Sequence, residues 1–403
     1  MKEVDTLEGT AEHHQPYTPS EAGFWRVTIA LMLASLSIFS TLYVFQPLLP
    51  VFTTELNITA TQSSLLMSAC VTAMVLGLFI LGFAADRYGR ALVMRGSLVG
   101  TALSLILIPM TPDFEWMVVL RFIQGFFLAG IPAAAMGYLG EEVSFRHIGL
   151  AMTLYISSNA LGGMGGRVLG GYLTDVFDWQ VTLWAFSVFG VVAAVLFLRL
   201  FPKERFFEKT EQNLIVDLKG MLIHLKSVPL LVLFLLGILM QTVFTAVWTY
   251  LPFYLEGDPF DWPLKWIAFT YFAYLFGVVA PPVAGRISDQ IGLKKMMFTG
   301  VTIFLTGTAL TAVREGWSIM IGLSLLCMGF FVAHSMASAL VSKTATHHRS
   351  GASGFYLISY YLGVAIGSTA VGRLWEEFQW YGVLSVVFLL VFLYVLYPFY
   401  KDA

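Results

Sequence analysis

The sequence predicts an all-α polytopic membrane protein with twelve transmembrane helices, arranged as two pseudo-symmetric six-helix bundles. Hydrophobic residues account for 58% of the 403 residues and charged residues for only 12%, a composition that needs lipid as its solvent. Apolar stretches of the roughly 20 residues that cross a hydrocarbon core recur twelve times between Val27 and Phe399. Backbone groups in lipid must be satisfied within the segment, so we expect each stretch to form a helix.

An internal repeat predicts the division into two bundles. The pattern Ser-x-x-Leu-Gly-x-x-x-Gly that begins at Ser158 recurs at Ser359, 201 residues later, and both copies end in Phe-x-Trp. Six helices return the chain to the side where it started, so the two bundles should have the same orientation. Parallel repeats of this kind place the substrate site at their interface, near the middle of the membrane.

The chain is expected to consist of four segments. Residues 1–23 are polar and lack the basic and apolar regions of a cleavable signal, so we expect a disordered cytoplasmic tail. The N-terminal six-helix bundle should occupy 24–201 and the C-terminal bundle 228–403. Between them, 202–227 should form a cytoplasmic linker with an amphipathic helix at the membrane surface.

The loop charges predict the orientation of the helices. Basic residues gather in the loops on one side, where Arg87, Arg90, Lys294 and Lys295 lie, whereas the loops on the other side are mainly acidic. Loops rich in Lys and Arg remain in the cytoplasm. We therefore expect a multi-pass protein of the plasma (inner) membrane with both termini in the cytoplasm.

A charged motif lies between the second and third predicted helices. The run from Gly82 to Arg90 reads Gly-x-x-x-Asp-Arg-x-Gly-Arg, and a degraded copy runs from Gly285 to Lys295. This pattern resembles the cytoplasmic loop signature of the major facilitator superfamily, and the resemblance extends along residues 24–400. It implies a secondary transporter of a small molecule that works by alternating access, in a drug/proton-antiporter-like or arabinose-efflux-like branch.

The resemblance also implies a cytoplasmic gate. Asp86 could cap the helix that follows the loop or meet the positive end of the eleventh helix, while Arg90 could pair with Glu141 or Glu142. In the superfamily such a cluster holds the two halves together while the cavity opens outward. The alternative is a solvated loop that obeys the positive-inside rule, which leaves Asp86 unexplained. The predicted gate residues are Asp86, Arg87, Gly89, Arg90, Glu141, Glu142 and Asp289.

The fifth predicted helix is rich in glycine, and small residues let helices approach closely. Its order Gly-x-x-x-Gly-Arg-x-x-Gly-Gly resembles the helix 5 motif of proton-coupled exporters in the superfamily. Arg167 stands where that motif has proline, so both the expected kink and the inference of export stay open. Glycine packing without directional meaning is the alternative. The predicted helix-packing residues are Gly162, Gly166, Gly170 and Gly171.

Two arginines, Arg121 and Arg167, lie deep inside predicted spans, and no Asp or Glu lies in the apolar part of any span. A buried arginine in a membrane helix faces a cavity or a partner and marks function. Without a counter-charge, the pair favours an anionic or strongly hydrogen-bonding substrate. Alternatively, the arginines cap backbone carbonyls or bind neighbours through Gln124 and Asn159. The run Arg121-x-x-Gln124-Gly resembles the helix 4 pattern of proton antiporters, which implies a role in coupling.

Other polar groups in the spans could line the cavity. Gln46 begins a segment, Gln-Pro-Leu-Leu-Pro, that resembles one in arabinose-efflux-like members of the superfamily. Histidine is the side chain that ordinarily titrates near neutrality, so His334 is a candidate proton carrier, although a packing histidine is equally consistent with the sequence. The further candidates are Tyr43, Asn159, Gln241, Trp248, Tyr250, Tyr356, Tyr360 and Tyr361.

These observations predict a secondary active transporter, with proton-coupled efflux of a small organic anion or polar metabolite as the favoured function. Uptake by an anion symporter or facilitator and multidrug export are the alternatives, and a non-transporting membrane receptor is the least favoured. The sequence has no phosphate-binding glycine loop with lysine, no metal cluster and no serine-histidine-acid pattern, so we expect no enzyme, no cofactor and no metal. The expected partners are the substrate, protons and the lipid bilayer, with no nucleic acid, for a monomeric protein.

Overall fold

The computed structural model describes residues 15–111, 113–207, 223–345 and 349–396. Within these ranges the secondary structure is helical, apart from one isolated bridge between Tyr17 and Val143. The amphipathic helix predicted for the linker falls mostly on 208–222 and so lies outside the described residues, as does most of the predicted tail.

Two groups of helices follow each other along the chain. The first group comprises α1 (Ala22–Tyr43), α2 (Phe45–Leu56), α3 (Ala60–Tyr88), α4 (Arg90–Leu107), η1 (Ile108–Met110), α5 (Phe114–Leu128), α6 (Gly130–Glu142), α7 (Ile148–Val176) and α8 (Trp179–Leu200). The second group comprises η2 (Ile223–Lys226), α10 (Val228–Glu256), α11 (Leu264–Thr270), η3 (Tyr271–Ala273), α12 (Tyr274–Ile291), α13 (Leu293–Leu310), α14 (Gly316–Thr344), α15 (Arg349–Ala365), η4 (Ile366–Ala370), α16 (Gly372–Ser385) and α17 (Val387–Leu396). Here η4 is a π-helical turn.

The predicted twelve spans are confirmed. Nine helical runs of the described chain are long and apolar enough to cross a membrane, and five of them join two or more helices, as the run of α1 and α2 does. The other three spans are α7, α13 and the run of α15 and η4, which are less apolar or shorter. The glycines and Arg167 of α7 explain its lower hydropathy.

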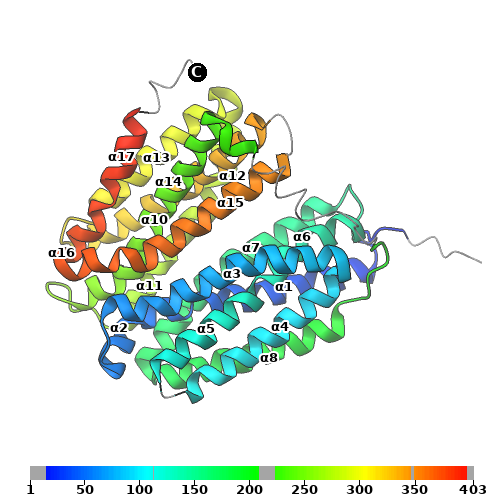
Figure 1. Ribbon diagram of the computed structural model, residues 1–403, viewed down its shortest axis with the longest axis horizontal. Helices are drawn as coiled ribbons and strands as arrows, with labels where there is room; N and C mark the ends of the chain where they lie inside the picture. The colour runs from blue at the N-terminus through cyan, green and yellow to red at the C-terminus, as the bar shows by residue number, and fades with distance from the viewer. Residues whose placement is uncertain (1–14, 112, 208–222, 346–348, 397–403) are drawn as a thin grey trace, which may run out of the picture.

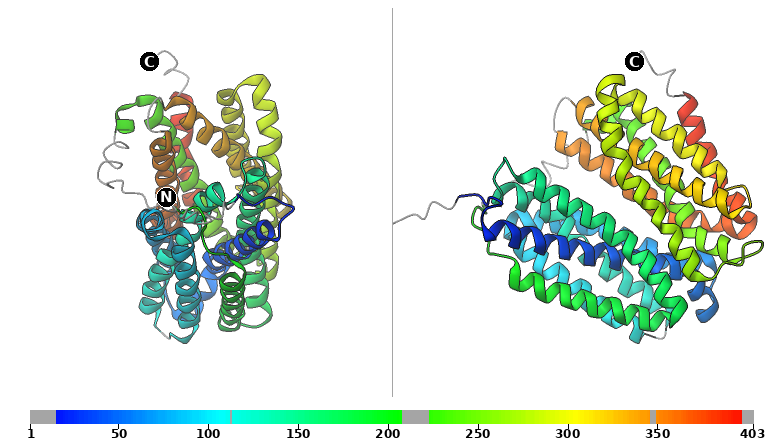
Figure 2. Two further views of the ribbon diagram at one scale, coloured as in Figure 1. Left: turned by 90° about the vertical axis from the view of Figure 1, so that its right-hand side faces the viewer. Right: turned by 180° about the vertical axis from the view of Figure 1, so that it is seen from behind.

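The two bundles meet at one end and diverge toward the other. Figure 1 shows α2, α11 and α16 together where the bundles meet, and Figure 2 shows the same divergence from behind. We call this meeting point the closed end. The opposite end, which carries the loops at Gly89 and Gly292, is the open end. The buried apolar side chains of the second bundle form one cluster and those of the first bundle form two, and among the described residues only Val168 and Val364 are buried members of a cluster of the opposite bundle.

Polar contacts at the closed end join the bundles. The hydroxyl of Thr369 lies 3.2 Å from that of Ser64 and donates to that of Ser68 at 2.6 Å. The backbone N–H of Thr61, at the start of α3, donates to Glu376 of α16 at 3.2 Å. These contacts are single hydrogen bonds.

The sequence repeat is visible in the helix packing. A methyl group at Gly162 would lie 2.6 Å from the carbonyl oxygen of Leu36 in α1, and one at Gly363 would lie 2.5 Å from that of Ile238 in α10. Gly166 likewise packs on Ser40 of α1. The glycines therefore let α7 and α15 touch the backbones of α1 and α10 in equivalent ways.

Glycines also define the two motif loops. Gly89 has φ +108° between α3 and α4, and Gly292 has φ +91° between α12 and α13. Residues with a Cβ rarely adopt these angles, so the equivalent glycine in each copy turns the chain directly from one span into the next.

Candidate substrate cavity between the bundles

A cavity of about 220 Å³ lies between the two bundles. Helices α1, α2, α3 and α7 of the first bundle and α10, α12, α14, α15 and η4 of the second line it. This is where parallel repeats are expected to place a substrate site. Of the sequence candidates, six line the cavity, together with Arg167: Tyr43, Gln46, Asn159, Gln241, Trp248 and Tyr360.

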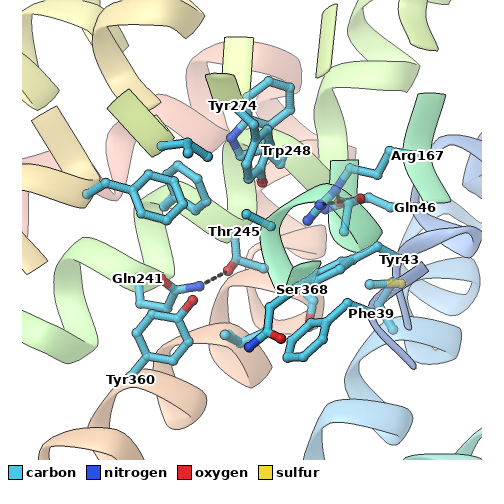
Figure 3. Close-up of a pocket in the computed structure, with 18 of the residues that line it drawn as sticks. Phe39, Tyr43, Gln46, Arg167, Gln241, Thr245, Trp248, Tyr274, Tyr360 and Ser368 are labelled. Atoms are coloured by element: carbon cyan, nitrogen blue, oxygen red, sulfur yellow. Dashed lines mark hydrogen bonds between the residues drawn. The ribbon is translucent and has the colours of Figure 1, made fainter. Parts of the chain in front are cut away.

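Arg167 carries the single formal charge among the described residues that line the cavity. Its Nε donates to Gln46 Oε1 at 2.6 Å and its Nη1 donates to the Gly163 carbonyl at 2.8 Å. Its Nη2 makes no hydrogen bond to any residue in the described part of the chain. Figure 3 shows Arg167 and Gln46 side by side at one edge of the cavity. A donor of this guanidinium is therefore available to a ligand.

Aromatic rings surround the Arg167 guanidinium. Its central carbon lies 3.6 Å from the ring centroid of Tyr43 and 4.5 Å from that of Tyr274, with Tyr271 at 5.6 Å. Such cation–π contacts stabilise a desolvated cation without neutralising it. No acidic side chain among the described residues pairs with Arg167, so its charge is uncompensated within the cavity.

Three amides complete the polar lining. Asn159 Oδ1 accepts from the hydroxyl of Ser35, and Gln46 accepts from Arg167. Gln241 Nε2 donates to Thr245 Oγ1 at 2.9 Å, whereas Gln241 Oε1 is buried without a partner. The rest of the lining is largely aromatic or aliphatic and includes Phe39, Met67, Ile156, Phe244, Val278, Phe331 and Val364.

Arg121 does not line the cavity. Its fully buried guanidinium donates to the carbonyls of Leu66 at 2.8 Å and Leu42 at 3.0 Å, and to Gln124 Oε1 at 2.5 Å. Leu42 and Thr41 lie at the end of α1, just before the break at Val44 between α1 and α2, so the Arg121 guanidinium supplies donors to carbonyls at this break. This geometry matches the carbonyl-capping alternative that the sequence left open.

His334 lies behind the cavity wall rather than in it. Its Nδ1 is 3.1 Å from the Tyr356 hydroxyl, and its ring centroid is 4.9 Å from that of Tyr360, which lines the cavity. The imidazole is thus one aromatic ring away from the ligand space.

The predicted gate residues lie at the open end. Arg90 donates to Asp86 at 2.9 Å and also pairs with Glu141. Glu142 pairs instead with Arg205, at 2.9 Å. These partners all belong to the first bundle or to the segment that follows it, so in this conformation the cluster does not join the two bundles. Arg87 and Asp289 are exposed.

Glu204, which the sequence did not single out, occupies the capping position proposed for Asp86. Its carboxylate accepts from the backbone N–H of Ala91 at the start of α4. Burial raises the pKa of this carboxyl, although the hydrogen bond to Ala91 opposes the shift. A methyl group at Gly89 would lie 3.0 Å from its Oε2, so the motif glycine also makes room for this cap.

Comparison with known proteins identifies the family. The model of the Major Facilitator Superfamily matches residues 31–280 and 264–402. The chain belongs to the major facilitator superfamily. It is 32% identical over 366 residues to the MFS-type transporter YybF of Bacillus subtilis, covering 90% of both chains. It is also 32% identical to the inner membrane transport protein YnfM of Escherichia coli over 371 residues, 91% of this chain and 88% of that one.

A solved structure supports the same fold. The nucleoside transporter NupG superposes with a TM-score of 0.76 at 14% sequence identity, over 94% of this chain and 99% of that one. The chain is therefore a multi-pass membrane transporter of the major facilitator superfamily, and not an enzyme. Among the described residues, no group of three or more His, Cys, Asp or Glu side chains could hold a metal ion.

Some cavity residues of this superfamily member were not predicted. Tyr274 lines the cavity and Tyr271 lies beside it; both flank the bend between α11 and α12 and contact the Arg167 guanidinium. Phe244 and Phe331 also line the cavity. With 34 Phe and 17 Tyr in the chain, aromatic identity alone gives no signal. Which of these rings face the cavity depends on how each helix is rotated about its own axis.

Proposed function

We propose that this transporter moves a small organic anion across the membrane by alternating access, with the anionic group bound to Arg167. The observation that carries the proposal is the Arg167 guanidinium, which faces the cavity with Nη2 unused and no acidic partner among the described residues. A charge-assisted hydrogen bond to an anion would use that donor.

The electrostatics of the cavity favour an anion over a cation. A buried cation without a counter-ion is costly, and a bound carboxylate or similar group would offset much of that cost. A lipophilic cation would meet Arg167 and find no carboxylate in the described lining. Binding of a lipophilic cation would therefore cost free energy twice, once for removing the cation from water and once for its repulsion by the Arg167 charge.

We infer proton-coupled efflux as the transport mode. His334 supports proton coupling, because it contacts Tyr360 and hydrogen-bonds to Tyr356 within one ring of the cavity.

The excess of Lys and Arg in the loops of the open end supports a cytoplasmic location for that end and for both termini, in the plasma membrane. Uptake would use the same cavity, driven by an inward ion gradient in a symporter or by the gradient of the substrate itself in a facilitator. The α3–α4 loop, with Arg90 bridging Asp86 and Glu141, is the proposed cytoplasmic gate.

Multidrug export is a second candidate. The aromatic lining, including Trp248, Phe244 and Phe331, favours flat apolar compounds of several kinds. In that case Arg167 would contribute little to binding energy.

A ligand screen with the purified full-length protein separates these candidates. Thermal stability is measured with organic anions, neutral sugars and lipophilic cations, for the wild type, Arg167→Lys and Arg167→Gln. A ligand that binds the folded state raises the melting temperature by mass action. We expect anions to stabilise the wild type, with at least tenfold weaker affinity in Arg167→Gln and partial retention in Arg167→Lys, because one charged hydrogen bond is worth about 1.5–3 kcal/mol. Stabilisation by cations that is unchanged in Arg167→Gln would contradict anion transport and support the multidrug candidate.

A flux assay then tests coupling and direction. The protein is reconstituted into liposomes with an imposed pH gradient, and transport of a stabilising anion is measured in each direction. Proton-coupled efflux predicts that the gradient drives the anion against its own gradient and that His334→Gln reduces this accumulation. Equal downhill transport with and without the gradient would support a facilitator instead.

A further inference from the structure

Gln241 presents a second polar group to the cavity, on the bundle opposite to Arg167. It lies on α10, its side chain is 3% exposed, and Gly363 of α15 leaves it room, since a methyl group there would lie 2.8 Å from the Gln241 Cβ. Its Nε2 is engaged with Thr245, while its Oε1 has no partner. Buried polar atoms without a partner are costly, and such atoms in a cavity wall mark a position where a ligand supplies the missing hydrogen bond.

The two polar groups face the cavity from opposite sides. Figure 3 shows Arg167 with Gln46 at one edge and Gln241 with Tyr360 at the other, with Trp248 and Phe39 on the walls between them. Arg167 belongs to α7 of the first bundle and Gln241 to α10 of the second. The rest of the lining is mostly aromatic or aliphatic, with Asn159, Thr245 and Ser368 as further polar members.

We propose that the substrate is a hydroxylated carboxylate with a flat apolar body, whose carboxylate binds Arg167 and whose hydroxyl group binds Gln241. This inference rests on the proposed anion transport and adds the second recognition point. A hydroxyl group both donates and accepts, so it satisfies the free atom of the Gln241 amide in either orientation of that amide. An ammonium group at the same position is disfavoured because no carboxylate lines the described cavity.

A bridging substrate has a mechanical consequence. One end of the molecule is held by the first bundle and the other by the second, so the ligand gains its full binding energy only when the bundles are at the matching separation. A substrate that lacks the hydroxyl group can still bind Arg167, but it contributes less to closing the bundles around it. Gln241 is thus a specificity-determining residue for both binding and transport.

The test uses small aromatic probes that differ by one group. Binding of 4-hydroxybenzoate, benzoate and 4-hydroxybenzamide to the full-length protein is measured by calorimetry, together with 4-hydroxyphenylacetate as a longer probe. We expect a hydroxylated acid to bind about tenfold more tightly than its counterpart without the hydroxyl group, because a neutral hydrogen bond contributes on that order. The uncharged amide should bind more weakly than either acid.

Gln241→Leu is the decisive variant, with Thr242→Val as its control on the same helix. The Thr242 hydroxyl donates to the Ile238 carbonyl, and Thr242 does not line the cavity. In Gln241→Leu the tenfold preference for the hydroxylated acid should fall to about one while benzoate affinity is retained, which also shows that the site is folded. Thr242→Val should keep the preference.

The outcomes separate the two proposals. If hydroxylated and plain acids bind wild type equally, or if the preference survives in Gln241→Leu, the role of Gln241 is wrong while anion binding stands. If no acid binds wild type and uncharged or cationic compounds do, anion transport fails as well.

Discussion

Arg121 and Arg167 belong to the same bundle, yet their guanidinium groups meet different surroundings. The Arg121 guanidinium donates to three backbone carbonyls, those of Leu66, Thr41 and Leu42, and lies 4.1 Å from the ring centroid of Phe45. The Arg167 guanidinium uses one carbonyl and one amide and faces the cavity. We therefore propose that Arg121 is a positioning residue that fixes the break between α1 and α2, which carries Tyr43 and Gln46 into the cavity.

Replacing Arg121 tests this difference. Arg121→Met keeps much of the apolar stem but leaves carbonyls around the α1–α2 break without a donor. Each unsatisfied buried acceptor costs about 1–3 kcal/mol, so we expect a melting temperature lowered by several degrees. Anion affinity, measured by calorimetry below the transition, should fall no more than a few-fold. A variant of unchanged stability that has lost binding or proton coupling would instead support the coupling role that the helix 4 resemblance implies.

At the scale of helices, the glycines of α7 divide into packed and open positions. Gly162, Gly166 and Gly170 lie against α1, whereas a methyl group at Gly165 would meet nothing within 4 Å. The packed glycines therefore allow the close approach of α7 to α1, whereas Gly165 has no such packing role.

Alanine substitutions at neighbouring positions measure this packing. Gly166→Ala would push a methyl group into the backbone of Ser40, so α7 and α1 must separate and stability should fall by about 1–3 kcal/mol. Gly165→Ala is the matched control and should be neutral or slightly stabilising, since alanine is favoured over glycine in a helix by about 1 kcal/mol. Thermal unfolding of both variants in the same detergent gives the comparison. An equal change in melting temperature for both variants would show that the close contact at Gly166 does not determine how α7 packs on α1.

The sequence predicts those features of the structure that depend on local backbone geometry, and it does not predict those that depend on how the helices are rotated. The 201-residue repeat predicts the equivalent packing of Gly162 and Gly363, and the motif spacing predicts the turns at Gly89 and Gly292. These features follow from local backbone requirements. The direction of the Arg121 side chain and the rings of Tyr271 and Tyr274 around Arg167 depend on helix rotation, which apolar stretches in lipid leave unspecified.

The salt-bridge cluster at the open end is also predicted only in part from the sequence. The sequence predicts that Arg90 pairs with Glu141 or Glu142, and the structure pairs it with Glu141. The sequence also offers Asp86 as the cap of α4 or as a partner of the eleventh helix, whereas Glu204 caps α4 in the structure. Glu204 comes from the segment after α8, more than a hundred residues away in sequence. A partner so distant in the chain, outside any repeated motif, leaves no local pattern to recognise.

At the scale of the whole molecule, alternating access requires the bundles to separate where they now touch. In this conformation they touch at the closed end through Ser64, Ser68 and Thr369, and they diverge at the end that carries the Asp86–Arg90 pair. For the cavity to open at the other side, the hydroxyl contacts must break and the open end must come together.

A reversible cross-link at the closed end tests this movement. The hydroxyl oxygens of Ser64 and Thr369 are 3.2 Å apart, so cysteines at both positions should form a disulfide in this conformation. Both native cysteines, Cys70 and Cys327, are buried, so they should not compete. We expect the oxidised double variant to retain anion binding and lose transport in liposomes, because the cavity can exchange ligand only through the open end. A reductant should restore transport, and each single cysteine variant should be insensitive to oxidation. Full transport by the cross-linked protein would mean that α3 and η4 do not separate, and that the substrate crosses the closed end by another route.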